Sequence, residues 1–265
     1  MTRNLAILFI SVSPLIGVQA LAWETGRPGV VAFGHGFSGM CTNCDLSGRN
    51  LDGARLSGGN FSSARFAGAR MRGAELSGSN FSRASFARAD LSDSEITGGN
   101  FAGASFAGAW LTRLEATGAN LNGVDLTGAE VGKAEFVATN LSGARFLGAS
   151  GVDTEFTGSN LSSAQFTSAS LVRASFNGAN MTSARLDQAD FRGADFTGTN
   201  MSGVRASRTR FNDADFTEAN IAGADLSGAI GLTQAQVTSA CGSKTTKLPT
   251  GMTVRVCNAV FRWRR

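Results

Sequence analysis

The sequence predicts an all-β solenoid, a four-sided (quadrilateral) parallel β-helix of about nine coils, followed by a short helical or irregular C-terminal cap. Two periods predict this fold. Large apolar residues recur at every fifth position between residues 46 and 226, and asparagine recurs at every twentieth position. Neither a helix nor a strand has a period of five. A square coil with five residues on each side explains both periods.

The first 22 residues lie outside the repeat. A largely apolar segment over residues 5–18 is followed by an A-x-A ending at Ala20 and Ala22. This pattern predicts a secretory signal peptide cleaved after Ala22, and hence a periplasmic or secreted protein. The alternative is an uncleaved anchor, since the apolar segment approaches the length that spans a bilayer. Pro14 and the small residues favour cleavage, and no later apolar stretch approaches that length.

We expect an N-terminal cap over residues 23–43 and the solenoid over residues 44–230. The five-residue register runs without insertion from Leu46 to Leu226, and fifteen of the 19 Phe residues fall in it, which excludes a chance pattern. The residue two positions earlier is usually Ala, and the residue two positions later is usually Gly. One large and one small inward residue on each side suit a narrow square core.

The twenty-residue period predicts columns of identical residues on successive coils. An asparagine column can form a ladder, because an amide both donates and accepts hydrogen bonds, and we assign it a structural role. Phenylalanine columns predict stacked rings in the core. At a strand-like spacing of about 4.8 Å, about nine coils make a rod about 45 Å long. The asparagines are Asn60, Asn80, Asn100, Asn120, Asn140, Asn160, Asn180, Asn200 and Asn220.

Three places depart from the pattern. Leu114 stands where a small residue is usual and Ala116 where a large one is usual, and Val204 with Ala206 repeats this exchange. We expect both exchanges to keep the core volume nearly constant. Gly151 has no such compensating neighbour, so we expect a void or a local bulge there.

The motif A-(D/N)-L-x-x occurs repeatedly, for example as ANLNG at residues 119–123 and ADLSG at residues 224–228. Over about residues 44–230 the sequence therefore resembles the pentapeptide-repeat proteins. The resemblance implies a right-handed quadrilateral β-helix, and homodimerisation through the C-terminal cap. The GLTQ segment at residues 231–234 is similar to that of exported proteobacterial members with cysteine-containing caps. Function does not follow, because fold and activity are only loosely tied.

Residues 231–265 leave the register and are expected to form the C-terminal cap and a basic tail. Thr233 can cap a short helix that runs to about Ala240. The tail could bind lipopolysaccharide, anionic lipid or nucleic acid, and the alternative is a frayed, solvated terminus. Its candidate contact residues are Arg262, Trp263, Arg264 and Arg265.

Four cysteines lie in two groups at the two ends of the rod, which excludes a bond between the groups within one monomer. In an oxidising compartment, Cys241 and Cys257 are predicted to staple the C-terminal cap, which contributes about 3 kcal/mol. Cys41 and Cys44 have either a local disulfide or capping role, or a redox or metal role. The second alternative needs a thioredoxin-like context or a fourth zinc ligand beside His35, and the sequence offers neither. We expect no metal and no cofactor.

The charge is unevenly distributed. Six of the 24 basic residues lie in residues 231–265, which contain no acidic residue, and one lies in the signal peptide. The other 17 share residues 23–230 with all 20 acidic residues, so this body carries a net charge of −3. The net positive charge of the chain therefore comes from residues 231–265, which argues against nucleic acid as a partner of residues 23–230.

A second outward column is acidic. Like charges stacked on successive coils cost each other about 0.6 to 0.8 kcal/mol in water. The column is either a docking face for a basic partner or cations, or a solvated strip whose repulsion is relieved by Arg113 and Arg145. Trp110, in an outward position beside Glu115, is the candidate partner anchor, although single exposed tryptophans are common. The column consists of Glu75, Glu95, Glu115, Glu135 and Glu155, then Ser175, Asp195 and Asp215.

No catalytic motif occurs: there is one His, no phosphate loop and no H-E-x-x-H. We therefore predict a non-enzymatic, exported rigid scaffold or binding module for a protein or cell-envelope partner. The alternative implied by the resemblance is a DNA-mimicking inhibitor of DNA gyrase or topoisomerase, of the quinolone-protection type. Mimicry needs a strongly negative rod, since DNA carries one charge per about 1.7 Å. The net charge of −3, the export signal and a column with four arginines argue against it: Arg65, Arg145, Arg185 and Arg205.

Overall fold

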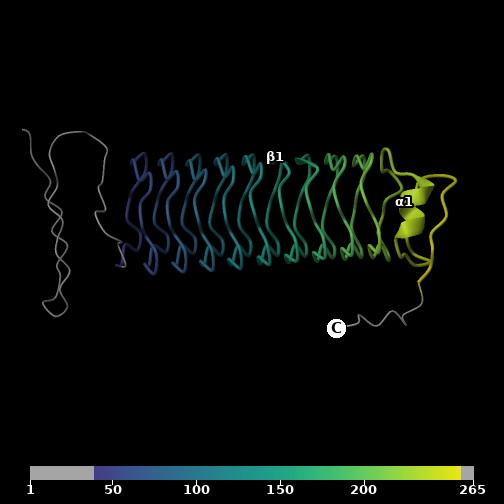
Figure 1. Ribbon diagram of the computed structural model, residues 1–265, viewed down its shortest axis with the longest axis horizontal. Helices are drawn as coiled ribbons and strands as arrows, with labels where there is room; N and C mark the ends of the chain where they lie inside the picture. The colour runs from purple at the N-terminus through teal and green to yellow at the C-terminus, as the bar shows by residue number, and fades with distance from the viewer. Residues whose placement is uncertain (1–38, 258–265) are drawn as a thin grey trace, which may run out of the picture.

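The structure is a computed structural model that describes residues 39–257. These residues form one elongated stack of coils, with a short helix and an irregular segment at its C-terminal end (Figure 1). The predicted signal peptide, residues 23–38 of the predicted N-terminal cap and residues 258–265 lie outside the described residues.

Every coil is joined to the next by parallel single-residue bridges, and the two partners of each bridge in the repeat are twenty residues apart. Successive bridges along the chain are five residues apart, so each coil has four faces. The four-sided coil that the two sequence periods predict is therefore confirmed. One coil shows the pattern: Asn100 pairs with Asn120, Ser105 with Asp125, Trp110 with Glu130, and Glu115 with Glu135.

We name the faces by their outward bridge residues. The asparagine face carries residues 60 to 220, the arginine face residues 45 to 225, the tryptophan face residues 50 to 230 and the glutamate face residues 55 to 215, each in steps of twenty. Along the chain the order is arginine, tryptophan, glutamate, asparagine. Because a coil has four faces, the glutamate face lies opposite the arginine face, and the tryptophan face lies opposite the asparagine face.

A two-residue turn forms each corner. Its second residue has a positive φ, whether it is Gly103 at 66° or Arg113 at 58°. This left-handed conformation suits glycine best, which explains the preference for Gly two positions after the large core residue. The corner also hydrogen bonds to the next coil, as Gly103 N donates to Asn122 O at 2.8 Å. Each coil is thus tied to its neighbour at corners as well as at faces.

The core is a column of inward side chains along the rod axis. Phenylalanine rings twenty residues apart stack with centroids 4.8 Å apart for Phe61 and Phe81, and 4.8 Å for Phe86 and Phe106. Rings from different faces meet edge to face, as for Phe146 and Phe156 at 5.6 Å. Offset stacks and edge contacts are the arrangements that aromatic quadrupoles favour. The ring stacking predicted from the columns is confirmed.

The two exchanged positions are accommodated within the regular coil. Leu114, Ala116, Val204 and Ala206 are all at most 1% exposed. The bridges on either side keep their spacing of twenty residues, as in Glu95–Glu115–Glu135. The exchange of large and small residues therefore leaves the backbone register unchanged.

The void expected at Gly151 is wrong. A Cβ atom there would lie 2.6 Å from Thr154 Oγ1 and 2.9 Å from Val131 Cγ2, so neighbouring side chains already fill the space. β1 (Ser150–Val152) pairs in parallel with β2 (Ser170–Val172) here, and the corner that follows β1 keeps the positive φ of the other corners, 57° at Asp153. The partners remain twenty residues apart, so no residue is inserted.

Helix α1 (Gln234–Ser239) covers the C-terminal end of the stack, as predicted. Thr233 is its N-cap and forms a capping box with Gln236. The Gln236 side-chain amide also donates to Phe211 O at 2.9 Å and to Ala214 O at 2.7 Å, so the cap satisfies carbonyls of the repeat. Among residues 39–257 there is no helix whose length and hydropathy suit a bilayer crossing.

Two disulfides close the described ends. Cys241 and Cys257 are bonded across the C-terminal cap, as predicted, and Cys41 is bonded to Cys44 across the first corner of the first coil, where Cys41 N donates to Asn60 O at 2.8 Å. The Cys41–Cys44 bond agrees with the first of the two alternatives from the sequence, a local disulfide. Within the described part of the chain, no three His, Cys, Asp or Glu side chains are grouped as a metal site would require.

Candidate interaction surfaces

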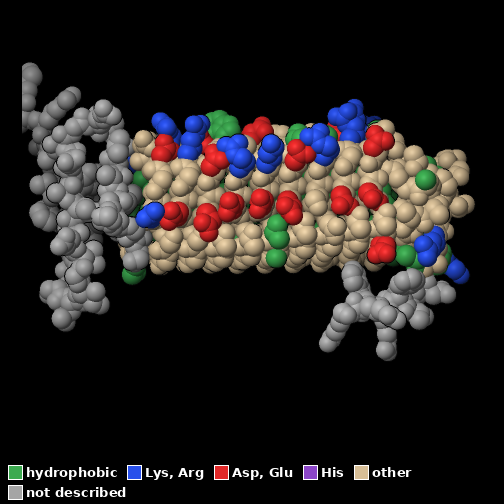
Figure 2. All heavy atoms as spheres, in the orientation of Figure 1, with side chains coloured by type: hydrophobic (Ala, Val, Ile, Leu, Met, Phe, Trp, Pro, Cys, Tyr) green, Lys and Arg blue, Asp and Glu red, His purple; other side chains and the backbone are tan. Residues whose placement is uncertain are grey.

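The glutamate face carries an unbroken acidic row. Glu75, Glu95, Glu115, Glu135 and Glu155 occupy five successive coils and bridge one another in order. Ser175 interrupts the row before Asp195 and Asp215. Figure 2 shows this row of acidic side chains running along the flank of the rod.

Most of this row has no cationic partner among the described residues. Glu75 pairs with Arg55 at 3.2 Å, and it is the only glutamate in residues 39–257 with an ion pair. Glu95 accepts a hydrogen bond from the Ser77 hydroxyl at 2.8 Å. Glu115 and Glu135 are exposed, with a like charge on the coil above and below. The acidic row is thus largely uncompensated within the described chain.

The expected relief of this repulsion by Arg113 and Arg145 is wrong. Arg113 lies at the corner before the glutamate face, and its guanidinium donates to both carboxylate oxygens of Asp93, at 2.5 and 2.7 Å. Arg145 belongs to the arginine face, on the opposite side of the rod. Proximity in sequence misled here, because neighbours in space lie twenty residues apart.

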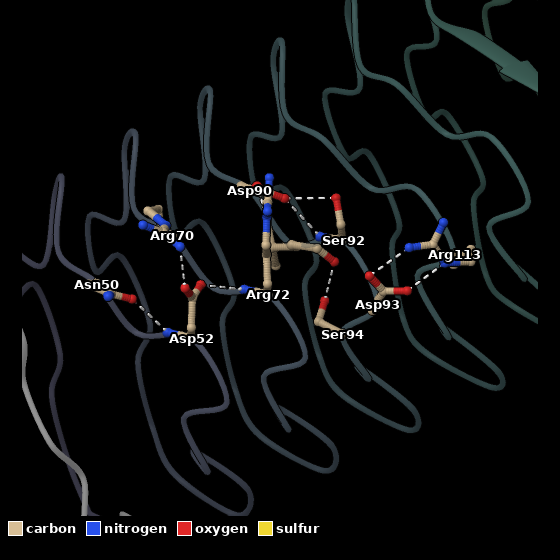
Figure 3. Close-up of polar contacts among 10 residues, drawn as sticks. Asn50, Asp52, Arg70, Arg72, Asp90, Ser92, Asp93, Ser94 and Arg113 are labelled. Carbon is tan, nitrogen blue, oxygen red and sulfur yellow. Dashed lines mark hydrogen bonds and ion pairs between the residues drawn. The ribbon is translucent and has the colours of Figure 1, made fainter.

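The corner between the tryptophan and glutamate faces is a charged but compensated strip (Figure 3). Figure 2 shows it as a row of mixed basic and acidic side chains beside the acidic row. Its pairs join adjacent coils: Arg70 with Asp52, Arg72 with Asp90, Arg113 with Asp93, and Arg173 with Asp153. The sequence analysis missed this strip, although opposite charges eighteen or twenty residues apart are visible in the sequence.

The compensation shows in the pKa values. The hydrogen bond from Arg113 lowers the pKa of Asp93, and the hydrogen bond from Arg173 lowers the pKa of Asp153. Burial alone would raise the pKa of Asp90, but hydrogen bonds from Ser92 and Arg72 outweigh burial and lower it. These aspartates are therefore held ionised by their partners.

Trp110 lies on the tryptophan face, one face before Glu115 in the same coil. Its side chain is 50% exposed, and its bridge partners are Asp90 and Glu130. A large, half-exposed aromatic side chain between acidic neighbours remains a candidate contact for a partner with both apolar and cationic groups.

The asparagine face is an unbroken hydrogen-bonded ladder. Each side-chain amide from residue 80 to residue 220 donates to the amide oxygen one coil earlier, at 3.1 to 3.5 Å. The oxygen of Asn120 also accepts from the backbone N–H of Asn122 at 3.3 Å, and this pattern recurs along the ladder. The asparagine side chains therefore use their hydrogen-bonding groups to hold successive coils together.

The arginine face carries exposed cations. Arg145, Arg185 and Arg205 make no ion pair with any residue in the range 39–257, and Arg185 and Arg205 lie on consecutive coils. Arg65 differs, because it pairs with Asp45 at 3.0 Å. Hydrogen bonds from Ser47 and Arg65 lower the pKa of Asp45 to about 2.

The family model for pentapeptide repeats matches eight copies between residues 41 and 230. The chain belongs to the pentapeptide-repeat family. No curated protein sequence matches it.

Solved structures of other pentapeptide-repeat proteins resemble this one. A trypsin-treated variant of QnrB1, a plasmid-mediated fluoroquinolone resistance protein, has 19% identity and a TM-score of 0.53, over 64% of this chain and 91% of that one. HetL from the cyanobacterium Nostoc has 24% identity and a TM-score of 0.27, over 78% of this chain and 84% of that one. The first similarity shows the fold alone.

The sites predicted in this pentapeptide-repeat protein are thus distributed over different faces. The acidic row and Trp110 lie on adjacent faces, whereas the asparagine ladder lies on the other side of the acidic row. The tail residues Arg262 to Arg265 lie outside the described residues.

Proposed function

We propose that this pentapeptide-repeat protein is an exported, non-enzymatic rigid scaffold whose glutamate face docks a cationic protein or cell-envelope partner. One observation carries the proposal. Glu95, Glu115, Glu135 and Glu155 stand in an unpaired row, while Asp93 and Asp153 at the adjoining corner are matched with arginines. The same fold that compensates charge at the corner leaves it uncompensated on the face.

The energetics favour a cationic ligand. Stacked carboxylates repel each other by about 0.6 to 0.8 kcal/mol per neighbouring pair in water, and a cation placed between two of them relieves that repulsion. The closely packed core holds the backbone positions of the glutamates at coil spacing, so binding orders only their side chains and not the backbone. Binding through exposed charges weakens with salt, because the Debye length shrinks to about 3 Å at 1 M.

Export, to the periplasm or beyond the cell, is supported by the signal-like residues 1–22 and by the two disulfides. Disulfides persist in oxidising compartments and are rare in the cytosol. Family membership supports the finer features of the fold that we propose, a right-handed helix of about nine coils. A reporter fused to residues 1–30 that stays in the cytoplasm would contradict export.

DNA mimicry is the weaker candidate. QnrB1 is described as a fluoroquinolone resistance protein, but its similarity to this chain extends to the fold only. Exposed Arg145, Arg185 and Arg205 place positive charge on the face opposite the acidic row, whereas a DNA-like rod must be negative all round. Inhibition of gyrase supercoiling by the purified protein would reverse this ranking.

The docking face is tested with poly-L-lysine as the cationic probe. Replacing Glu115, Glu135 and Glu155 by Gln should weaken binding about tenfold, since three exposed charge contacts contribute about 0.5 kcal/mol each. A control with the same loss of three charges elsewhere combines Asp125→Asn, Asp187→Asn and Asp225→Asn, away from the glutamate and tryptophan faces, and should bind almost as wild type. Equal weakening in both variants would mean that net charge, and not the glutamate face, attracts the probe.

The natural partner is sought by capture from envelope extract with the same two variants and with Trp110→Ala. We expect the Gln variant to lose a partner that the control retains. If Trp110→Ala loses that partner too, the contact extends onto the tryptophan face. A partner retained by every variant would remove both contact sites.

A further inference from the structure

We propose that the cationic partner of the glutamate face is the arginine face of a second copy of this chain, so that the rods associate side by side. This inference rests on the proposed function and names the partner of its docking face. The observation that carries it is charge complementarity between two opposite faces of one molecule.

The arginine face has the properties that such a partner needs. Arg145, Arg185 and Arg205 are exposed and have no ion pair within residues 39–257. Arg185 and Arg205 bridge consecutive coils, so two cations are stacked as the glutamates are. Each face alone contains repulsion between like charges, and contact between the two faces would relieve both.

The two faces point in opposite directions. Residues ten apart lie in the same coil on opposite faces, because each face takes five residues and a coil has four faces. Each unpaired arginine therefore has an acidic residue directly across the rod. These combinations are Arg145 with Glu155, Arg185 with Asp195, and Arg205 with Asp215.

The repeat spacing makes the faces match along their length. The stacked rings fix the coil spacing, with centroids 4.9 Å apart for Phe156 and Phe176 and 5.0 Å for Phe176 and Phe196. Two copies have the same spacing, so two parallel rods with coils level bring Arg145, Arg185 and Arg205 of one copy to acids of the other. The one like-charge pair in this register is Asp125 with Glu135. Equal spacing also allows whole-coil shifts that keep the arginines among the glutamates.

The resulting contact is heterologous, since it joins two different faces. Each rod would keep one free acidic face and one free basic face, so association does not close at a dimer but continues as a row. A single narrow face also buries little area, which makes each contact weak and salt-sensitive.

The test is analytical ultracentrifugation of the purified protein at ionic strengths of about 0.01 M and about 1 M. We expect the weight-average mass to rise with protein concentration beyond a dimer at low salt, and to return to the smallest species at high salt. Arg145→Glu, Arg185→Glu and Arg205→Glu together should abolish the rise, because both faces are then acidic. Glu155→Arg, Asp195→Arg and Asp215→Arg together should also abolish it, because Arg145, Arg185 and Arg205 of one copy then face arginines of the other.

Mixing the two reversed proteins should restore association, since an acidic face then meets a basic one. A control for net charge compares the triple Arg→Gln variant of the arginine face with Asn50→Asp, Ser150→Asp and Ser170→Asp on the tryptophan face. Both change the charge by three units, but only the first should weaken association. Circular dichroism of each variant confirms that the coil is intact.

Two results would overturn the inference: wild-type protein that does not grow beyond a dimer at the lowest salt, or reversed variants that fail to associate when mixed. Association that both reversed variants retain would place the contact elsewhere, for example at the C-terminal cap. Poly-L-lysine binding separates the two proposals. If wild type binds the probe through the glutamate face, as the loss in its Gln variant would show, and yet does not self-associate, the docking face stands and the second copy is not its partner.

Discussion

The exchanged pair Leu114 and Ala116 offers a quantitative test of how this core is filled. Both side chains are buried in the same coil, at 1% and 0% exposure, with the large residue in the position that is usually small. If Leu114 fills the space that a large residue at position 116 would take, the two positions must be coupled. Leu114→Ala alone should cost about 3 to 4 kcal/mol through the lost transfer free energy and the cavity. Ala116→Leu alone should cost about 1 to 3 kcal/mol, because the extra methylenes overpack a filled core.

The double variant Leu114→Ala with Ala116→Leu restores the usual arrangement. It should therefore lie within about 1.5 kcal/mol of the wild type, as volume-conserving changes do. Additive behaviour predicts a loss of about 4 to 7 kcal/mol, so the coupling free energy should be at least about 2.5 kcal/mol. Urea unfolding followed by circular dichroism gives the free energy of unfolding of the wild type, the two single variants and the double variant, provided that the m-value is unchanged.

A matched control makes the reverse exchange where the pattern is regular. Ala119→Leu with Leu121→Ala, both positions 1% exposed, should show coupling of the same sign. A double variant at 114 and 116 that is as unstable as the sum of its single variants would refute the volume argument. The exchange would then be two independent adaptations of the backbone.

Four further outcomes follow from the structure. Asn120→Ala removes one rung of the ladder and the acceptor for Asn122 N, and should lower the free energy of unfolding by about 1 to 3 kcal/mol in urea titrations. Gly151→Ala places a Cβ 2.6 Å from Thr154 Oγ1 and should cost about 1 to 3 kcal/mol, whereas Gly123→Ala, with nothing within 4 Å, should show only the backbone cost of its positive φ. Cys257→Ser should destabilise the cap by about 3 kcal/mol, seen as faster hydrogen exchange at α1 and not in the central coils. Asp45 should titrate at about 2 by NMR; because its folded pKa lies below the unfolded value of about 3.9, its contribution to stability is complete above the unfolded value and is lost as the pH falls through about 2.

The fold was predictable because the twenty-residue period of the coil recurs in the sequence from each coil to the next. The positions of Phe61 and Phe81 depend only on counting in twenties, and the N-cap at Thr233 depends only on its neighbour Gln236. Gly151 was not predictable in the same way. The sequence shows that a side chain is missing, but only the coordinates show that Thr154 and Val131 occupy the space.

For the candidate surfaces, the sequence predicts on which face each residue lies, but it does not predict which side chains contact each other. Counting placed the acidic row on one face and Arg145 on another, yet the expected help from Arg113 failed. An arginine at a corner can reach either of two faces or the next coil, and which one it takes depends on its rotamer and on the acid within reach. The pairs at this corner therefore required side-chain positions (Figure 3).

The comparison of two columns shows which outward residues the fold itself requires. All nine asparagine positions are filled by Asn, and each member bonds to its neighbours, so the ladder belongs to the machinery that holds the coils together. The acidic column behaves differently. Ser175 replaces a carboxylate there and still bridges Glu155 and Asp195, so the backbone does not need acid at that face. A row of five glutamates that repel one another is therefore not required for folding, and this supports the docking role that we propose for the glutamate face.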